Sequence, residues 1–128
     1  MLCVKTRLGP SPIEGVGLFA AEPIARGTVV WRYDPRFDLR LDMRDIPSDD
    51  LITRQWLMRY GYQPTADPVY VVCGDNARFM NHSETPNCDD VDDETVAIVD
   101  IAEGEEITCD YARFDARFAQ HRFAVGWA

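Results

Sequence analysis

Short β-prone runs, most of them bounded by glycine or proline, limit what this chain can fold into. Val, Ile, Thr and aromatic residues are concentrated in five runs: residues 2–8, 28–33, 69–73, 95–99 and 106–111. Runs of this composition between turn-forming residues are typical of strands. We therefore expect a strand-rich α+β fold with more short strands than helices. The length of the chain fits one unit, so we expect residues 1–128 to form a single domain.

Residues 48–60 carry the clearest helix signal in the middle of the chain. Ser48 is a suitable N-cap, and the acidic residues that follow it suit the positive end of the helix dipole. Apolar side chains then recur at helical spacing before Gly61 stops the run: Ile52, Trp56 and Tyr60. The preceding residues 34–47 mix charges with proline and predict an irregular or weakly paired segment.

A second helix is expected at the C-terminal end, over residues 112–124. Its aromatic side chains fall at near-helical spacing: Phe114, Phe118 and Phe123. Such a stripe is more often core packing than a ligand contact, but Phe114, Phe118 or Trp127 can also cover a bound adenine ring. We expect the motif-bearing core to span residues 15–111 and residues 112–128 to close it.

The charge balance restricts the partners. The chain has 13 Lys and Arg against 22 Asp and Glu, which gives a formal net charge of −9. Binding to nucleic acid needs clustered basic side chains, so we expect no direct nucleic-acid partner. A basic protein or peptide fits better, and the acidic run at residues 89–94 can steer one at long range. A solvated turn is the plainer explanation of the same run.

The sequence gives little indication of membrane or secretory targeting, or of cysteines grouped for a metal or a disulfide. No segment approaches the roughly 18 apolar residues of a membrane span, and the N-terminal residues lack the apolar run of a secretory signal. The four cysteines stand singly, with no CxxC pair: Cys3, Cys73, Cys88 and Cys109. We therefore expect no membrane association, no structural metal, reduced thiols and a cytoplasmic location. We expect a monomer or a homodimer.

The segment at residues 77–88 holds most of the candidate chemistry. It reads ARFMNHSETPNC and follows a buried-looking strand. Polar turn residues that bond the local backbone explain it about as well as a binding site does. Two further segments change that balance: Gly15-Val16-Gly17 near the start, and residues 104–111, GEEITCDY, near the end.

In this order the three segments resemble the motifs of the SET-domain protein-lysine methyltransferases, namely a GxG loop, an RFxNHxxxPN segment and a GEExxxxY segment. The resemblance covers roughly residues 4–115. It implies a fold of small curved β-sheets in which the chain near Tyr111 threads the segment around Asn81, forming a pseudoknot. It also implies that S-adenosylmethionine and a peptide enter from opposite faces and meet through a narrow channel.

The resemblance also implies roles for individual residues. Cofactor contacts are expected from Gly15, Val16, Gly17, Leu18, Arg78, Asn81 and His82. Glycine permits close backbone approach and dihedral angles closed to other residues. Asn81 offers a side-chain carbonyl to the ammonium group of the cofactor, and the backbone of His82 can pair with adenine. Phe79 is expected in the core, and Asn87 is expected to lock the turn through backbone bonds.

Tyr111 is the expected catalytic residue. Its phenol and nearby carbonyls can hold the methyl group and the amine in line, partly through weak C–H···O contacts. Tyr33 and Cys109 are expected to line the substrate channel. In the family a glycine often stands two residues after the position of Tyr33, and here that residue is Pro35. Cys109 stands where many relatives carry an aromatic side chain, so a thiol there leaves room for di- or trimethylation.

Three hypotheses remain open from the sequence. The first is an S-adenosylmethionine-dependent protein-lysine methyltransferase. The second is a catalytically weak or inactive module of the same fold that binds basic peptides. The third is an unrelated thiol or metal enzyme built from Cys73, Asp75, His82 and Cys88, although their spacing matches no familiar ligand pattern.

Overall fold

The computed structural model describes residues 1–118 of the chain. Its α-helix is α1 (Leu51–Tyr60). Its strands are β1 (Thr6–Pro10), β2 (Val16–Ala20), β3 (Val29–Arg32), β4 (Leu39–Asp42), β5 (Gly61–Tyr62), β6 (Val69–Val72), β7 (Asn81–His82), β8 (Cys88–Val91), β9 (Glu94–Ala97) and β10 (Thr108–Cys109). Single 3₁₀ turns lie at Met43–Asp45, Asn76–Phe79 and Tyr111–Arg113. The strand-rich α+β fold is therefore confirmed.

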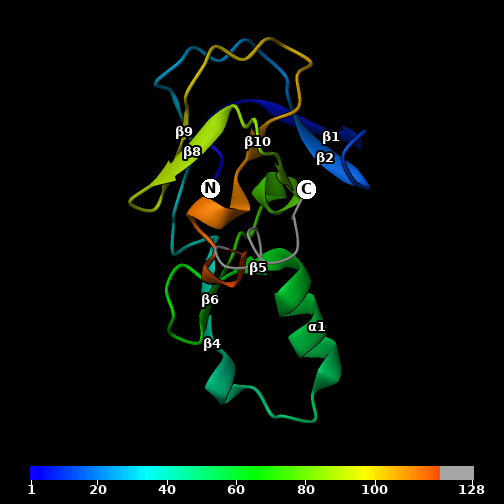
Figure 1. The fold of residues 1–128 in the computed structure, drawn as a ribbon, viewed down its shortest axis with the longest axis vertical. Helices are drawn as coiled ribbons and strands as arrows, with labels where there is room; N and C mark the ends of the chain where they lie inside the picture. The colour runs from blue at the N-terminus through cyan, green and yellow to red at the C-terminus, as the bar shows by residue number, and fades with distance from the viewer. Residues whose placement is uncertain (119–128) are drawn as a thin grey trace.

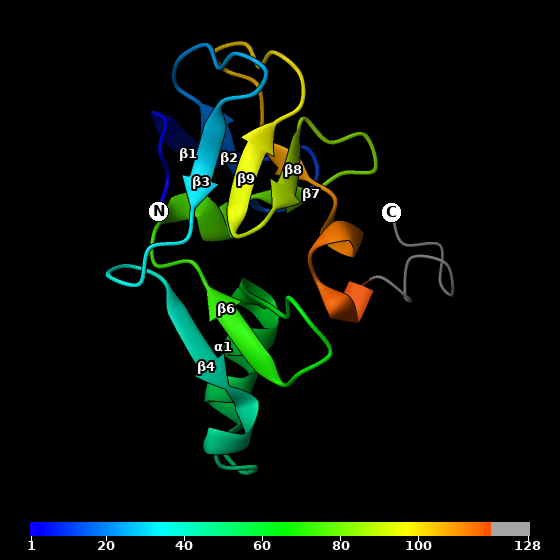
Figure 2. The same cartoon turned by 90° about the vertical axis from the view of Figure 1, so that its left-hand side faces the viewer.

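The strands form four small sheets rather than one large one. The hairpin β1–β2 is antiparallel, β3–β9–β8 and β4–β6–β5 have three strands each, and β7 pairs with β10. Figure 1 shows the first two sheets in the upper half of the molecule, with β4 and α1 extending below. After a quarter turn, β3, β9 and β8 lie above β4 and β6, and α1 lies behind the lower sheet (Figure 2).

The main core lies among the upper strands. Its fully buried members include Leu18 of β2, Val30 of β3 and Ile107 before β10. A smaller buried cluster of Trp31, Cys73 and Ala77 lies apart from it. Because burial of apolar area is the main stabilising term, the upper half holds most of the packing that fixes the fold.

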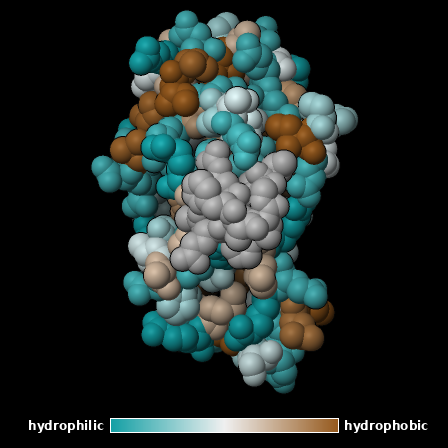
Figure 3. All heavy atoms as spheres, viewed as in Figure 1, coloured by the Kyte–Doolittle hydropathy of each residue, from teal (hydrophilic) through white to brown (hydrophobic). Residues whose placement is uncertain are grey.

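Helix α1 is confirmed, but its boundary and its face differ from the sequence-based prediction. Asp50, not Ser48, caps it, since the Asp50 Oδ1 accepts the Thr53 N–H at 3.1 Å. The helix contacts β5 and β6 and buries Leu57, whereas Ile52 is 83% exposed. Ile52 and Trp56 of the predicted stripe are therefore exposed. Figure 3 shows a hydrophobic patch at the lower right of the surface, on the side where Figure 1 places α1.

Two other segments differ from expectation. Residues 34–47 contain β4, which pairs antiparallel with β6. Its four residues alternate leucine with charged side chains, a pattern too short to stand out among the surrounding charges. The run at residues 106–111 keeps only the two-residue β10, and Asp110 caps a 3₁₀ turn in place of the helix start predicted at residue 112. Residues 116–118 are helical. The rest of that prediction, with Phe123 and Trp127, lies outside the described residues.

The parallel pairing of β7 with β10 joins the two distant motif segments. Thr108 is opposite Asn81, and Cys109 is opposite His82. Asn87 strengthens the junction: its Nδ2 donates to the Glu106 carbonyl at 2.8 Å, and its Oδ1 accepts the Thr108 N–H at 2.9 Å. The backbone bonds predicted for Asn87 are present, but they tie it to the segment at β10 and not within its own turn. The threading of a pseudoknot stays a prediction.

Within residues 1–118, every helix is too short or too polar to span a bilayer.

Candidate active site

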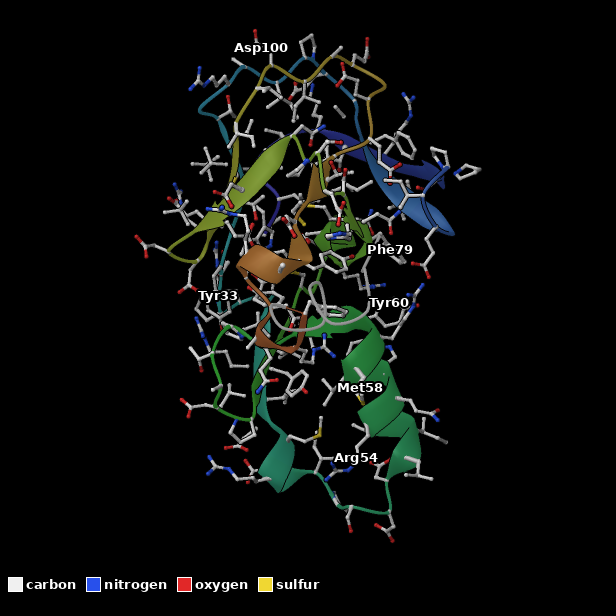
Figure 4. All side chains as sticks on the ribbon, in the orientation of Figure 1. Tyr33, Arg54, Met58, Tyr60, Phe79 and Asp100 are labelled. Atoms are coloured by element: carbon white, nitrogen blue, oxygen red, sulfur yellow. The ribbon has the colours of Figure 1, made fainter. Side chains whose placement is uncertain are left out.

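A cavity of about 290 Å³ lies where the two halves of the molecule meet. Its walls come from the loop before β2, the end of α1, β5, the segment around β7, and the residues after β10. Figure 4 shows Tyr60, at the end of α1, close to Phe79. Their ring centroids are 6.1 Å apart in an edge-on contact. Phe79 is half-buried and lines the cavity instead of lying in the core, so that prediction is wrong.

Asn81 is held in one orientation by a hydrogen-bond network. Its Nδ2 donates to three oxygens: Ser11 Oγ at 3.1 Å, the Glu14 carbonyl at 3.0 Å and Glu106 Oε2 at 2.9 Å. These acceptors fix the amide so that its Oδ1 is the oxygen left for a ligand. We call Ser11, Glu14, Asn81 and Glu106 the Asn81 network. It can present a carbonyl to a cationic group without first reorganising.

The two glycines near the start are needed for different reasons. Gly15 adopts a φ of +48°, and a Cβ there would meet nothing within 4 Å, so the requirement is the left-handed backbone. A Cβ on Gly17 would lie 2.5 Å from Glu106 Oε2, so the requirement is space for a carboxylate of the Asn81 network. The close approach predicted for Gly17 was to a ligand and stays a prediction, whereas the neighbour observed is a protein side chain.

Tyr111 is oriented at both its backbone and its hydroxyl. Its N–H donates to His82 Nδ1 at 3.0 Å, and its hydroxyl donates to the Met80 carbonyl at 2.6 Å. Burial raises the pKa of the Tyr111 phenol well above its usual value. The hydroxyl therefore stays protonated at neutral pH and acts by positioning, with oxygen lone pairs still available to weak C–H donors. The imidazole of His82 supports Tyr111.

The buried thiols are poor nucleophiles. Burial raises the pKa of Cys109 well above that of a free thiol and raises that of Cys88 to about 12. Burial raises the pKa of Cys73 as well. A thiol that stays protonated neither attacks nor ligates well. Among residues 1–118 no group of three or more potential ligand side chains is arranged for a metal. The thiol or metal enzyme therefore has no site in the described part of the chain.

The structure brings most of the predicted site residues to one cavity. Its lining includes Val16, Arg78, Asn81, His82, Cys109 and Tyr111. Four others are not part of that lining. Gly15 and Gly17 shape the loop, and Leu18 is completely buried in the main core, where its backbone carbonyl accepts the Ile107 N–H at 2.8 Å. Tyr33 packs edge-on against Trp31, with ring centroids 6.5 Å apart. The roles predicted for these residues remain predictions.

A second, smaller cavity of about 170 Å³ adjoins the first. Four side chains line both cavities, and we call the space they enclose the Asp90 chamber: Trp31, Tyr62, Asp90 and Phe114. Asp90 was predicted as part of a solvated acidic run. The sequence did hold a signal for the burial of Asp90. In a strand, alternate residues share one face, so Asp90 lies on the same face as the apolar Cys88. Cys88 is fully buried and Asp90 is half-buried.

The sequence of residues 15–112 matches the family model of the SET domain. The chain belongs to the SET domain family. A human relative, histone-lysine N-methyltransferase SETD1A, is 38% identical over 87 residues, which are 66% of this chain and 5% of that protein. Drosophila melanogaster histone-lysine N-methyltransferase SETD1 is 33% identical over 87 residues, with the same shares. This SET domain thus spans only about a twentieth of the length of the curated relatives it matches.

Solved structures show the same fold. A candidate histone methyltransferase of Plasmodium falciparum superposes with a TM-score of 0.62 at 19% identity, covering 84% of this chain and 93% of that one. A chain of the Polycomb Repressive Complex 2 of Chaetomium thermophilum has a TM-score of 0.64 at 24% identity, covering 91% and 16%. At these identities the likeness concerns the fold alone, and confirms the SET-type architecture.

Proposed function

We propose that this SET domain is an S-adenosylmethionine-dependent protein-lysine N-methyltransferase that acts on a lysine in a basic protein or peptide. The observation that carries the proposal is the β7–β10 pairing. It sets the open carbonyl of Asn81 and the oriented hydroxyl of Tyr111 in one cavity. The curated relatives are histone-lysine methyltransferases by name, which supports the same class of reaction.

The residues at the Asn81 network suit the amino-acid end of the cofactor. A free amino acid carries an ammonium and a carboxylate, so its site needs acceptors and donors close together. No group within residues 1–118 donates to Asn81 Oδ1, and Arg78 and Arg59 line the same cavity as cationic donors. Glu14 Oε1 pairs with Arg59 Nη1 at 3.1 Å, so the local charge is balanced. S-adenosylmethionine, when bound, supplies an electrophilic methyl group on a sulfonium.

The side chains of this chain have three tasks in the transfer. A lysine amine has a reference pKa of about 10.4 and must lose its proton before it can attack. A dry channel beside a cation favours the neutral amine by desolvation and like-charge repulsion. Tyr111 and the Met80 carbonyl then hold the amine and methyl group in line, which lowers the entropic barrier. Because the phenol of Tyr111 is already protonated, it does not accept the proton that the lysine amine loses, and that proton escapes to solvent.

The wider properties of the substrate follow from charge. A chain of net charge −9 attracts a lysine that lies within a basic segment. The small thiol of Cys109 leaves space beside the amine, which favours more than one methyl addition. We place the protein in the cytoplasm, as a monomer or homodimer, since nothing in the charge or packing of the described residues calls for another setting.

Calorimetric titration with S-adenosylmethionine tests the proposal directly. We expect saturable one-site binding by the parent and a clear loss of affinity in Asn81→Ala. Asn76→Ala is the matched control, because Asn76 is exposed and does not line the cavity. A parent that binds is then assayed with labelled cofactor and purified core histones.

The outcomes separate the alternatives. Binding with methyl transfer supports the enzyme. Binding of basic peptides without cofactor binding or transfer supports instead the inactive module of the same fold, for which the missing glycine after Tyr33 is the favouring observation. Equal cofactor affinity in the parent and Asn81→Ala contradicts the role given to Asn81.

A further inference from the structure

Three Asp-x-Arg segments of the described chain fold into the same local contact, at residues 34–36, 42–44 and 115–117. In each, the backbone N–H of the arginine donates to Oδ1 of the aspartate two residues earlier. Nε and Nη2 of the same arginine bind the two carboxylate oxygens, at N···O distances from 2.6 to 3.1 Å. The local sequence is enough to form this contact, and the three copies differ in what surrounds them.

The third copy is the buried one. The side chains of Arg36 and Arg44 are 78% and 72% exposed, whereas that of Arg117 is 18% exposed. Its partner Asp115 is 2% exposed. An exposed ion pair contributes little to stability, and a buried one has a desolvation cost that its own attraction often fails to recover. The reason for a charged pair at this buried place therefore lies in its other contacts.

Arg117 uses its remaining donors on the end of α1. Its Nη1 donates to the carbonyl of Met58 at 3.0 Å, and its Nη2 donates to the carbonyl of Gly61 at 2.7 Å. Met58 lies in the last turn of α1 (Figure 4), where the final carbonyls have no partner within the helix. A cation also suits the negative end of the helix dipole. Arg117 therefore joins the segment after Tyr111 to the C-terminal end of α1.

The same segment is tied to the residue that follows β5. The Ala116 N–H donates to the Gln63 carbonyl at 2.7 Å, and the Gln63 N–H donates to Asp115 Oδ1 at 3.3 Å. The guanidinium of Arg117 also lies over the ring of Tyr70 on β6, 5.2 Å from its centroid. We call the pair Asp115 and Arg117 the Arg117 clamp. It connects the segment after β10 with α1, β5 and β6.

The clamp lies between two aromatic residues that pack on Tyr111. The ring centroids of Phe114 and Phe118 are each 5.6 Å from that of Tyr111. All three rings line the first cavity, together with the two clamp residues. The Asp115 N–H donates to the Tyr111 carbonyl at 2.9 Å. Because both rings are sequence neighbours of the clamp, its attachment to α1 determines where they meet Tyr111.

We propose that Asp115 and Arg117 are positioning residues, which fix the segment after β10 to the end of α1 and thereby hold the ring of Tyr111 in place for methyl transfer. The proposal rests on the proposed function and deepens it, because it names residues that act through Tyr111. Neither residue makes or breaks a bond. A misplacement of about 1 Å at a reacting centre can cost about 100-fold in rate, so a clamp at this point controls turnover.

A pair of matched double variants tests the clamp. Asp115→Asn with Arg117→Met removes both charges together, so no unpaired charge is left buried. The Asn keeps an oxygen for the Gln63 N–H, and the Met keeps an apolar chain over Tyr70. Asp42→Asn with Arg44→Met is the control, because it removes the same local contact at an exposed place that does not line the first cavity.

Single-turnover assays and calorimetry with S-adenosylmethionine give the first readout. We expect the clamp variant to lose about tenfold or more in turnover, while its cofactor affinity stays close to that of the parent because the Asn81 network is untouched. The control should match the parent in both. Partial unfolding would instead lower the number of binding sites per chain. Parental turnover in the clamp variant, or an equal loss in the control, overturns the inference.

The ring resonances of Tyr111 give a readout that needs no cofactor. They are followed in protein labelled with ¹³C-tyrosine and assigned with Tyr111→Phe. We expect them to shift in the clamp variant and to stay in place in the control, and unchanged resonances in both overturn the inference. A parent that binds no cofactor removes the proposed enzyme, and these resonances then still decide whether the clamp positions the ring.

Two further measurements apply if the clamp variant fails to fold. Arg117→Lys keeps the charge beside Asp115, but an ammonium cannot bind both carboxylate oxygens and both carbonyls, so turnover should still fall. In the parent alone, the guanidinium N–H resonances of Arg117 should be separate because rotation is hindered, and those of Arg44 should be averaged. Equal averaging at Arg117 and Arg44 overturns the inference.

Discussion

The Asn81 network and the Asp90 chamber lie in the same pair of cavities but are built in opposite ways. In the network, the amide of Asn81 donates to three oxygens, and the Ser11 hydroxyl donates to the Glu106 carboxylate at 2.8 Å. In the chamber, Asp90 has a single hydrogen-bonded partner for its side chain, and the Trp31 N–H has none among the described residues. One region is preorganised by satisfied bonds, and the other keeps capacity for an incoming group.

Tyr111 lines the first cavity together with Asn81 and Asp90, and its hydroxyl gives the largest expected effect. Tyr111→Phe removes the oxygen that donates to the Met80 carbonyl. We expect turnover to fall about 100- to 1,000-fold, the usual cost of losing one preorganised polar contact at a reacting centre. Cofactor affinity should stay unchanged, because the Asn81 network is intact. Single-turnover assays with calorimetry measure both. A variant that turns over like the parent would contradict the role of Tyr111.

Asp90→Asn tests whether the buried carboxylate of the chamber lowers the free energy of unfolding. Well below pH 3.8 the carboxyl is protonated in both states, and between its usual pKa of 3.8 and its folded pKa of about 6 the unfolded state is the one that ionises. The parent should therefore lose stability as pH rises through that window. By the conversion of about 1.4 kcal/mol per pKa unit, the penalty reaches about 3 kcal/mol above pH 6.

The measurement is urea unfolding of the parent and Asp90→Asn at pH 4 and pH 8. We expect the variant to be the more stable protein at pH 8 and to match the parent near pH 4. Asp89→Asn serves as control, since Asp89 already pairs with Arg113. A variant that is less stable at both pH values would show that the two regions do not differ in the way described.

Gly17→Ala tests the tight packing of the Asn81 network. The added Cβ would lie 2.5 Å from Glu106 Oε2 and 3.0 Å from the Ser11 Cβ. We expect a loss of about 1–3 kcal/mol in unfolding free energy, together with weaker cofactor binding, as overpacking shifts the network. Thermal unfolding and the cofactor titration report the two effects. Unchanged values for both would show that the network tolerates movement.

Gly15 should give the smallest effect, and one of a different kind. Its φ of +48° penalises Ala, but no atom lies within 4 Å of an added Cβ. Gly15→Ala should cost about 1–2 kcal/mol through backbone strain alone. Gly15→Asn should be more stable than Gly15→Ala, because Asn tolerates the left-handed region. Gly17→Asn should be no more stable than Gly17→Ala, because both side chains lack space there. Thermal unfolding of these variants distinguishes strain from lack of space.

Local patterns were enough to predict much of the fold. Strands β3, β6 and β9 follow β-branched and aromatic runs, and α1 follows a group of polar and acidic residues. Strand β1 overlaps the run at residues 2–8 only in part, because it continues through Gly9 and Pro10, where a break was expected. Strand β4 was not predicted, since its alternation of leucine with charged residues covers only four positions in a segment rich in charges, and its partners on β6 lie about thirty positions away in the sequence. The exposed side of α1 was misjudged for a related reason. Helical spacing shows which residues share a face, but only the neighbouring sheet decides that Leu57 is the one buried.

The sequence by itself determined the family and the chemistry of the motifs, because Asn81, the glycines and Tyr111 carry their functional groups wherever the chain places them. Only the tertiary structure decided which groups meet. The β7–β10 pairing brings Tyr111 to Met80 and His82, and the β3–β9–β8 sheet sets Trp31 and Asp90 on either side of Thr95, where both line the same cavity. The environment of a carboxylate depends on burial and distant neighbours. The pKa of one carboxyl in an acidic run, and its effect on stability, can therefore be judged only in the folded chain.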